Sequence, residues 1–399
     1  MPKSTSDSQF LIAGGGIAGL AAAIALGRLG LDVRVFEKAE AFSGEGAGIQ
    51  LGPNASKILD QWGVLDHLKN KAVQSEGVAI GDGLSGEHLA TVPFGETAQE
   101  RYGAPFLLVH RSDLHKALLE VARSNSGFKT EMGHQALSFV QSTDGVSLTT
   151  SQGETKGRAL ILADGLWSQL RYEIDRGAAL QFTGYMAWRA LIDASDMPEP
   201  LQAPWTGLWL GKKAHIVHYP VSGGKKINIV AVISDRWGGR SDGWSHEGDP
   251  DFLIPEFEDW NEMPAQLLRI PAAWRTWPLF KMPPLRAWTQ GAVTLIGDAA
   301  HPVLPFLAQG GGMAIEDAAV LGKILGENED DPWQSFQPFE QARIERTART
   351  SFESRQTGTI YHMGGIFRLA RNFVLKRRSP EALLKRLDWL YGFDVDKKA

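Results

Sequence analysis

Three glycines with a fixed spacing, and an acid that follows them, are the residues of this chain best suited to bind a ligand. Gly14, Gly16 and Gly19 form the pattern G-x-G-x-x-G, and Glu37 follows Gly19 by eighteen residues. Gly14 permits a tight turn, Gly16 has no side chain to keep a pyrophosphate away, and Gly19 lets a helix lie close to a strand. Glu37 is placed to accept hydrogen bonds from a ribose hydroxyl. The pattern therefore predicts a dinucleotide site.

The residues around the glycines predict the elements that must position them. Residues 9–13 form a short apolar run typical of a strand, residues 17–29 are rich in Ala and Leu and predict a helix, and residues 33–36 predict a second strand. The N-terminus of the helix offers free N–H groups and a positive dipole end to phosphates. A second copy of the pattern, at residues 81–86, has no helix after it and is interpreted as a hairpin turn.

The composition excludes several classes of function. The chain has 399 residues, 43% hydrophobic and 22% charged, which is typical of a globular protein long enough for two domains. A net charge of −5 argues against a nucleic-acid partner. The absence of cysteine excludes disulfides, thiolate zinc sites and a catalytic cysteine, and the ten histidines show no metal-binding spacing, so we predict no metal. Residues 1–9 are polar, and we expect a cytoplasmic protein.

A second strand, turn and helix pattern follows about 300 residues after the first. Residues 292–296 predict a strand that ends in Gly297-Asp298, and the glycines Gly310–Gly312 precede a helix predicted over residues 313–326. The helix dipole would stabilise negative charge in front of these glycines. Asp298 could bind a polyol hydroxyl. Two loops of this kind suggest one extended ligand held at both ends, and FAD fits that length better than a nicotinamide cofactor.

The residues between the two loops predict a mostly antiparallel sheet. Within the predicted strand 214–221, His215 and Tyr219 share one face, whereas His218 points to the other. At about 3.3 Å per residue, the Cα atoms of His215 and Tyr219 lie roughly 13 Å apart, which leaves room for one aromatic ring between them. The same two residues could equally be hydrogen-bonded structural groups.

Two other stretches have alternative interpretations. Arg111 follows a predicted strand and could contact a cofactor phosphate or pair with a carboxylate.

The last segment, residues 333–392, predicts amphipathic helices, with seven basic residues between positions 367 and 390. A basic amphipathic helix can lie on a membrane surface, but a solvated face or a subunit contact is more common. We therefore expect no membrane contact.

Together these motifs resemble the fingerprints of single-component FAD-dependent aromatic hydroxylases, over essentially the whole chain. The resemblance is strongest to the branch of 3-hydroxybenzoate 6-hydroxylase and salicylate hydroxylase. It rests on GGGIAGL with Glu37, Arg111, Asp164-Gly165 and GDAAHP at residues 297–302. It also rests on GAGIQLGPNA at residues 46–55, HIVHYPVSGG at residues 215–224, AQGGGMAIEDA at residues 308–318 and RLDWLYGF at residues 386–393.

The resemblance implies an α/β fold, α+β overall, with a Rossmann-like FAD-binding domain, an inserted mostly antiparallel β-sheet substrate domain and a C-terminal helical segment. We expect a discontinuous FAD-binding domain at residues 1–72, 101–180 and 280–330, a substrate domain at residues 73–100 and 181–279, and the helical segment at residues 331–399.

The resemblance also implies which residues form the site. His215, Tyr219 and Gln309 match residues that meet the substrate. His215 would take or relay the phenolic proton, Tyr219 would orient the hydroxyl, and Gln309 would hydrogen-bond the substrate or the peroxide. The residues expected to contact FAD are Gly14, Gly16, Ile17, Ala18, Gly19, Glu37, Lys38, Gly48, Arg111, Asp164, Asp298, Pro305, Gly310, Gly311 and Gly312.

The implied reaction is hydroxylation of a phenolic aromatic acid similar to 3-hydroxybenzoate or salicylate. It would use tightly bound, non-covalent FAD, transient NADH or NADPH, and O2, through a flavin C4a-hydroperoxide. We expect a homodimer. Alternatives are a hydroxylase of an N-heteroaromatic acid, a flavin-dependent dehydrogenase or halogenase, and a flavin-binding protein without turnover. The halogenase pattern W-x-W-x-I-P is absent.

Overall fold

A six-stranded, mostly parallel sheet carries the glycine turn. The structure is a computed structural model that describes residues 9–42, 46–235, 246–328 and 330–397. The strand order is β19-β20-β12-β1-β2-β8, and every pair is parallel except β19 with β20. The strands are β1 Phe10–Ala13, β2 Val33–Glu37, β8 Phe128–Met132, β12 Ala159–Leu162, β19 Thr289–Gln290 and β20 Val293–Leu295.

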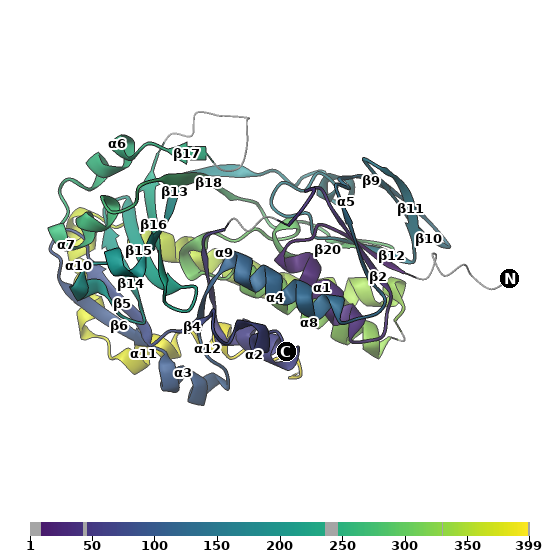
Figure 1. The fold of residues 1–399 in the computed structure, drawn as a ribbon, viewed down its shortest axis with the longest axis horizontal. Helices are drawn as coiled ribbons and strands as arrows, with labels where there is room; N and C mark the ends of the chain where they lie inside the picture. The colour runs from purple at the N-terminus through teal and green to yellow at the C-terminus, as the bar shows by residue number, and fades with distance from the viewer. Residues whose placement is uncertain (1–8, 43–45, 236–245, 329, 398–399) are drawn as a thin grey trace.

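Three helices pack beside this sheet and beside one another (Figure 1). They are α1 Ile17–Gly27, α4 Arg111–Arg123 and α8 Gly310–Glu327, and α1 contacts both of the others. The strands β1 and β12 are buried along their whole length, which explains why they are continuous apolar runs. A Cβ on Gly322 would lie 3.0 Å from the Cβ of Ala25, so small residues bring α1 and α8 close together.

An eight-stranded sheet lies at the other end of the molecule (Figure 1). Its order is β17-β18-β13-β16-β15-β14-β5-β6, and all its pairs are antiparallel except β14 with β5. The hairpin predicted around residues 81–86 is therefore an edge of this sheet. Its strands are β5 Gly77–Asp82, β6 His88–Pro93, β13 Gln181–Asp193, β14 Trp205–Gly211, β15 Ala214–Val221, β16 Lys226–Ser234, β17 His246–Gly248 and β18 Trp274–Lys281.

Two small sheets and several short helices complete the part before residue 330. The small sheets comprise β3 Gly48–Leu51, β4 Val73–Gln74 and β7 Leu107–His110, and β9 Ala136–Ser142, β10 Gly145–Thr150 and β11 Gly153–Gly157. The short helices are α2 Pro53–Gln61, α3 Gly95–Tyr102, α5 Arg171–Ile174, α6 Pro250–Leu253 and α7 Glu262–Ala265. Single 3₁₀ turns are η1 Leu65–Leu68, η2 Ala194–Asp196, η3 Glu199–Leu201, η4 Ile254–Phe257, η5 Gln266–Leu268, η6 Gly297–Ala299 and η7 Pro305–Leu307.

The C-terminal helices are tied to the eight-stranded sheet by ion pairs. Asp82, at the end of β5, is fully buried and lies 2.6 Å from Arg368 and 3.3 Å from Arg371. Two of the basic residues that suggested a membrane surface are therefore internal partners of an acid. Among the described residues, none of the helices has both the length and the apolar character needed to cross a membrane. The helices are α9 Pro332–Tyr361, α10 Gly365–Arg377, α11 Pro380–Lys385 and α12 Asp388–Tyr391.

The expected fold class is confirmed, with a Rossmann-like parallel sheet, a separate antiparallel-rich sheet and C-terminal helices. One boundary was wrong. The helix expected to begin at Met313 begins at Gly310, so the three glycines are its first turn rather than a loop before it. The first N–H groups of a helix have no partner within the helix, so helix propensity decides little at these positions.

Candidate active site

The carboxyl ends of four neighbouring parallel strands meet at one edge of the six-stranded sheet. The glycine turn follows β1, Glu37 ends β2, Asp164 comes shortly after β12, and Asp298 comes shortly after β20. Open α/β sheets bind ligands outside this edge. The fold thus brings together the two loops that the sequence analysis linked to one extended ligand.

The glycine turn has the geometry that its three glycines require. Gly14 has a φ of +107°, and a Cβ there would lie 2.3 Å from the Ala163 carbonyl oxygen. A Cβ on Gly19 would lie 1.9 Å from the Gly14 carbonyl oxygen, which prevents any larger residue at this position. A Cβ on Gly16, in contrast, would have no atom within 4 Å. Gly16 therefore leaves open space in front of the N-terminus of α1, where a pyrophosphate can approach the backbone.

The Glu37 carboxylate is held beside this turn. Its Oε2 accepts a hydrogen bond of 2.8 Å from the Gly15 N–H, and its Oε1 accepts one of 3.0 Å from the Ala39 N–H. The side chain is half-buried and keeps acceptor capacity for a ribose hydroxyl. Lys38, the next residue, is exposed.

A cavity of about 430 Å³ runs from this edge to the eight-stranded sheet. His215 and Tyr219 line it, whereas Gln309 does not. The predicted FAD contacts that line it are Gly16, Ile17, Ala18, Gly48, Arg111, Asp298, Pro305, Gly310 and Gly311. The predicted FAD contacts outside its lining are Gly14, Gly19, Glu37, Lys38, Asp164 and Gly312.

The start of α8 faces the Asp298 carboxylate. A Cβ on Gly310 would lie 3.9 Å from the Asp298 Oδ1, and a Cβ on Gly311 would lie 2.7 Å from the Ile49 Cδ1. The missing side chains thus leave backbone N–H groups accessible from the cavity and allow β3 to pack closely. Desolvation raises the pKa of Asp298, against the opposing effects of His301 and Arg111.

An unpaired carboxylate oxygen marks the neighbouring strand end. The Oδ1 of Asp164 is buried and has no hydrogen-bond partner within the described residues. Burial raises the pKa of this carboxyl, although a hydrogen bond from Ser168 opposes the shift. A buried polar atom without a partner is costly, so this oxygen fits a site that receives a polar ligand. Arg111 is exposed at the start of α4, and its side chain lines the cavity. The edge as a whole fits a dinucleotide.

The strand β15 presents His215 and Tyr219 to the cavity, as its alternation predicted. Both side chains are almost fully buried, whereas Ile216 packs into the core on the opposite face. A Cβ on Gly48 would lie 2.5 Å from the Tyr219 ring, so the glycine of β3 makes room for the tyrosine. Burial raises the pKa of Tyr219 well above its usual value, so its hydroxyl is a neutral donor at physiological pH.

His215 has a histidine partner that the sequence analysis missed. The Nδ1 of His215 lies 2.8 Å from the Nε2 of His362, in the segment between α9 and α10. Burial and the nearby His362 hold the pKa of His215 well below its usual value, so the imidazole is neutral. Phe306 covers the pair, with its ring centre 5.6 Å from that of His215. The two histidines are 147 residues apart, and no local pattern links them.

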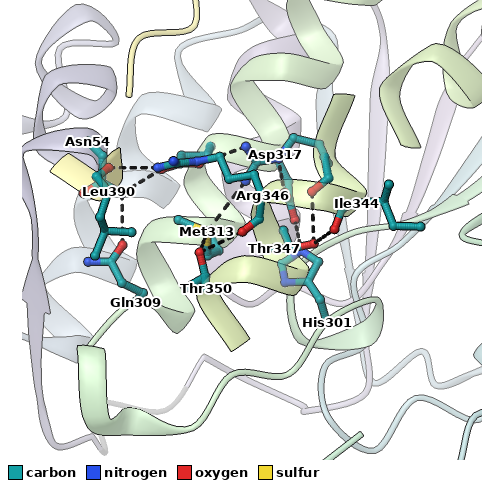
Figure 2. Close-up of polar contacts among 12 residues, drawn as sticks. Asn54, His301, Gln309, Met313, Asp317, Ile344, Arg346, Thr347, Thr350 and Leu390 are labelled. Carbon is teal, nitrogen blue, oxygen red and sulfur yellow. Dashed lines mark hydrogen bonds and ion pairs between the residues drawn. The ribbon is translucent and has the colours of Figure 1, made fainter. Parts of the chain in front are cut away.

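Gln309, the residue before α8, is buried and does not line the cavity. Its Oε1 accepts a hydrogen bond of 3.0 Å from the amide of Asn54, which also donates to Glu316 at 2.7 Å (Figure 2). Arg346 closes the network from α9 with two hydrogen bonds to Glu316, of 2.6 and 2.7 Å. Direct contact between Gln309 and a substrate therefore stays a prediction, and Asn54 was not anticipated.

A second buried network fixes the loop that carries Asp298. Asp317 on α8 accepts hydrogen bonds from the Gly297 N–H at 2.9 Å and from Arg343 at 2.7 Å. It also lies 2.5 Å from His301 (Figure 2). Burial alone would raise the pKa of Asp317, but His301 and Arg343 lower it to about 2. An ionised Asp317 thus joins α8, α9 and the strand end at Asp298.

Comparison with known proteins decides the family. The family described as FAD binding domain matches residues 7–335. The chain is 38% identical to a 3-hydroxybenzoate 6-hydroxylase of Polaromonas naphthalenivorans, over 99% of this chain and 98% of the relative. This chain belongs to the FAD-dependent aromatic hydroxylases. The hydroxylase is also 35% identical to a 3-hydroxybenzoate 6-hydroxylase of Klebsiella oxytoca, over 97% of each chain. A salicylate hydroxylase in a substrate complex has the same fold, with a TM-score of 0.83, 24% identity, and coverage of 98% of this chain and 97% of that chain.

The predicted reaction class is therefore confirmed. The hydroxylase is an FAD-dependent monooxygenase that acts on a small aromatic substrate with NAD(P)H and O2. The described residues contain no group of three or more His, Cys, Asp or Glu side chains that could hold a metal ion.

Proposed function

We propose that the hydroxylase adds oxygen to 3-hydroxybenzoate at the ring position para to its hydroxyl. The identity over the whole chain to two relatives named 3-hydroxybenzoate 6-hydroxylase supports this substrate. The observation that carries the proposal is one cavity with the dinucleotide edge at one end and His215 and Tyr219 at the other. A ring bound beside these two residues would lie within the same enclosed space as the cofactor.

The residues at the strand edge would hold FAD. The open space at Gly16 would receive the pyrophosphate, Glu37 would accept a hydrogen bond from the ribose, and Asp298 would bind the polyol chain. When bound, FAD would carry the two electrons of NAD(P)H to O2 and so supply the activated oxygen for the reaction. We also propose that Gly14, Gly19, Lys38, Asp164 and Gly312 shape this site from outside the cavity lining.

His215 removes the phenolic proton of the substrate. The O–H bond breaks, its electron pair stays on oxygen, and a new N–H bond forms on the neutral imidazole. The resulting phenolate is a better nucleophile than the phenol, which favours attack by the ring on an electrophilic oxygen. Since the pKa of His215 is well below its usual value, the imidazole is neutral and free to accept the proton, and His362 orients it through their shared hydrogen bond. Tyr219 orients the phenolic oxygen by donating a hydrogen bond.

The cavity wall keeps water away from the reacting atoms. Phe306, Val217, Val230 and Val232 line the space around His215 with apolar surface. Exclusion of water protects a reactive oxygen species from unproductive decay to hydrogen peroxide. Gln309 acts in this proposal as a positioning residue, because its link to Asn54 fixes the backbone at the start of α8.

The remaining expectations are also proposals. We propose NADH as the electron donor and a cytoplasmic location. We propose the domain ranges 1–72, 101–180 and 280–330 for FAD, and 73–100 and 181–279 for substrate. The division of the strands into two large sheets supports them, although β18 extends to residue 281. We propose a homodimer in which α10 forms the contact surface. This helix exposes five large apolar side chains, those of Ile366, Phe367, Leu369, Phe373 and Val374.

The test is a panel of aromatic acids with the purified, FAD-loaded hydroxylase. We expect 3-hydroxybenzoate to stimulate NADH oxidation and to yield a product that carries one added oxygen, para to the hydroxyl by NMR. Salicylate and 4-hydroxybenzoate should give mainly peroxide or no stimulation. Efficient turnover of salicylate with loss of carbon dioxide would contradict the assigned substrate. Sedimentation of the same sample measures the oligomeric state.

A further inference from the structure

We propose that Arg189 binds the carboxylate of the aromatic substrate and makes the hydroxylase selective for aromatic acids. This inference rests on the proposed function, in which the ring lies beside His215 and Tyr219. Arg189 lies on β13, is half-buried, and lines the same cavity. No pattern in the sequence distinguishes it from the other arginines.

Within the part of the chain that the structure describes, the guanidinium of Arg189 has no acidic partner. Its Nε is buried without a hydrogen-bond partner among the described residues, and no carboxylate is among the groups that shift its pKa. Its neighbour is the Trp277 ring, whose centre lies 5.2 Å from the Arg189 Cζ. Burial lowers the pKa of Arg189. A half-buried cation without an anion loses part of its hydration, and an anionic ligand in the cavity would compensate for that loss.

Strand register places Arg189 opposite the space between His215 and Tyr219. Arg189 pairs with Val230 on β16, and Val230 pairs with Val217 on β15. Val217 lies midway between His215 and Tyr219 on the cavity face of its strand. Two strand spacings of about 4.8 Å separate the backbones of Arg189 and Val217, or roughly 10 Å. A benzoate ring lying over Val230 would therefore have Arg189 at one side and the β15 pair at the other.

The chemistry of the two sides matches a hydroxybenzoate. A guanidinium binds a carboxylate with two parallel hydrogen bonds, and the fixed fork of arginine selects for this planar group. The phenolic hydroxyl then points towards His215 on β15, and the apolar ring lies over Val230. The two polar groups of the ring diverge, so they need partners on different strands, which Arg189 and His215 provide.

A second arginine in the cavity is better suited to the cofactor. Among the residues that line the cavity, Arg111 and Arg189 are the two with a permanent positive charge. Arg111 is exposed at the start of α4, and its backbone N–H donates to Ala47 at 3.0 Å. It thus lies at the edge that the FAD fingerprint occupies. Arg189 lies on the wall formed by the eight-stranded sheet, where the substrate would bind.

The experiment compares an acid with its neutral amide. Binding of 3-hydroxybenzoate and of 3-hydroxybenzamide to the oxidised FAD-loaded hydroxylase is measured without NADH, from the change in flavin absorbance. Arg189→Gln should weaken binding of the acid about 10- to 100-fold, the range of a lost charge-assisted hydrogen-bond pair, and should change amide binding less than about twofold. Arg189→Lys should restore part of the acid affinity, because it keeps the charge and loses the fork.

Controls separate this role from a structural one. Arg269→Gln removes an exposed arginine whose partner is Glu262, and should leave both affinities unchanged. Since Arg189 forms no ion pair with any described residue, Arg189→Gln should retain FAD and melt no lower than the unmodified protein. Equal losses for acid and amide, or loss of FAD, would overturn the proposal. If another aromatic acid binds in an Arg189-dependent way but 3-hydroxybenzoate does not, the assigned substrate fails and the carboxylate site stands.

Discussion

The imidazoles of His215 and His362 share one hydrogen bond, 2.8 Å long, across 147 residues of sequence. One ring must donate at this contact and the other must accept, so the proton on one nitrogen fixes the tautomer of the partner ring. The Nδ1 of His362 is buried without a partner among the described residues. His362 is therefore a positioning residue that orients the proposed base and prevents both rings from being charged together.

Replacement of His215 should stop hydroxylation and leave FAD in place. His215→Ala removes the proton acceptor, and we expect product formation to fall about 100-fold or more, the usual contribution of general base catalysis. NADH oxidation should continue with hydrogen peroxide as its product. Product and peroxide are quantified against NADH consumed, and FAD content is read from the absorbance spectrum.

His218 offers a matched control on the same strand. It is as buried as His215, faces away from the cavity, and lies 3.3 Å from the Trp209 Nε1 through its own Nε2. His218→Ala should keep the ratio of product to NADH, whatever its effect on the melting temperature. If the two variants lose coupling to the same extent, the assignment of His215 as the base is wrong.

Replacement of His362 should move the acidic side of the pH profile. His215 accepts a proton only when it is neutral, and the nearby His362 contributes to holding its pKa well below the usual value. His362→Phe removes that contribution, so the pKa of His215 should rise. The pH at which kcat falls to half its plateau on the acidic side should then rise towards neutrality. Measurements of kcat between pH 5 and 8 at saturating substrate test this. An unchanged profile would exclude coupling between the two histidines.

Two alanine substitutions in the glycine turn should have different effects. A Cβ on Gly16 meets no protein atom, so Gly16→Ala should keep the melting temperature of the apoprotein and weaken FAD binding. A Cβ on Gly19 would lie 1.9 Å from the Gly14 carbonyl oxygen, so Gly19→Ala should lower both stability and FAD affinity. FAD titration and thermal melting of the apoproteins give the two quantities. Loss of stability in Gly16→Ala without loss of affinity would refute the assigned roles.

Removal of Arg343 should destabilise the whole fold. Its guanidinium is fully buried, 2.7 Å from Asp317 and 2.9 Å from Glu316. Arg343→Met leaves two buried carboxylates without this partner, and we expect the free energy of unfolding to fall by about 3–5 kcal/mol in denaturant titrations. The exposed pair of Arg269 and Glu262 provides the comparison, since Arg269→Gln should cost less than about 1 kcal/mol. Comparable losses in the two variants would mean that burial of the Arg343 pair is not what stabilises the fold.

Features set by local sequence were predictable. The glycine spacing determined the turn after β1, because close backbone contacts at Gly14 and Gly19 allow no other residue. The alternation of β15 placed His215 and Tyr219 on one face, because a strand has a period of two residues.

Features that depend on long-range packing were not predictable. His362 and Arg189 reach the cavity from segments whose positions depend on helix and strand packing, and no spacing relates them to His215. Gln309 was expected to meet the substrate, but its side chain accepts a hydrogen bond from Asn54 and does not line the cavity. The glycines at the start of α8 were interpreted as a loop, since their low helix propensity gives no sign that a packed helix begins there.

The place of β20 in the six-stranded sheet also determines when that sheet can form during translation. β12 lies between β1 and β20, so one edge of β12 lacks its partner until residues 293–295 have been made. The strand end that carries Asp298 follows only then. A nascent chain therefore exposes an unpaired, apolar strand edge from the time residue 162 is made until residue 295 is made, which favours aggregation and makes chaperones useful. The FAD-binding edge is completed late, although the glycine turn after β1, which belongs to the same edge, is synthesised early.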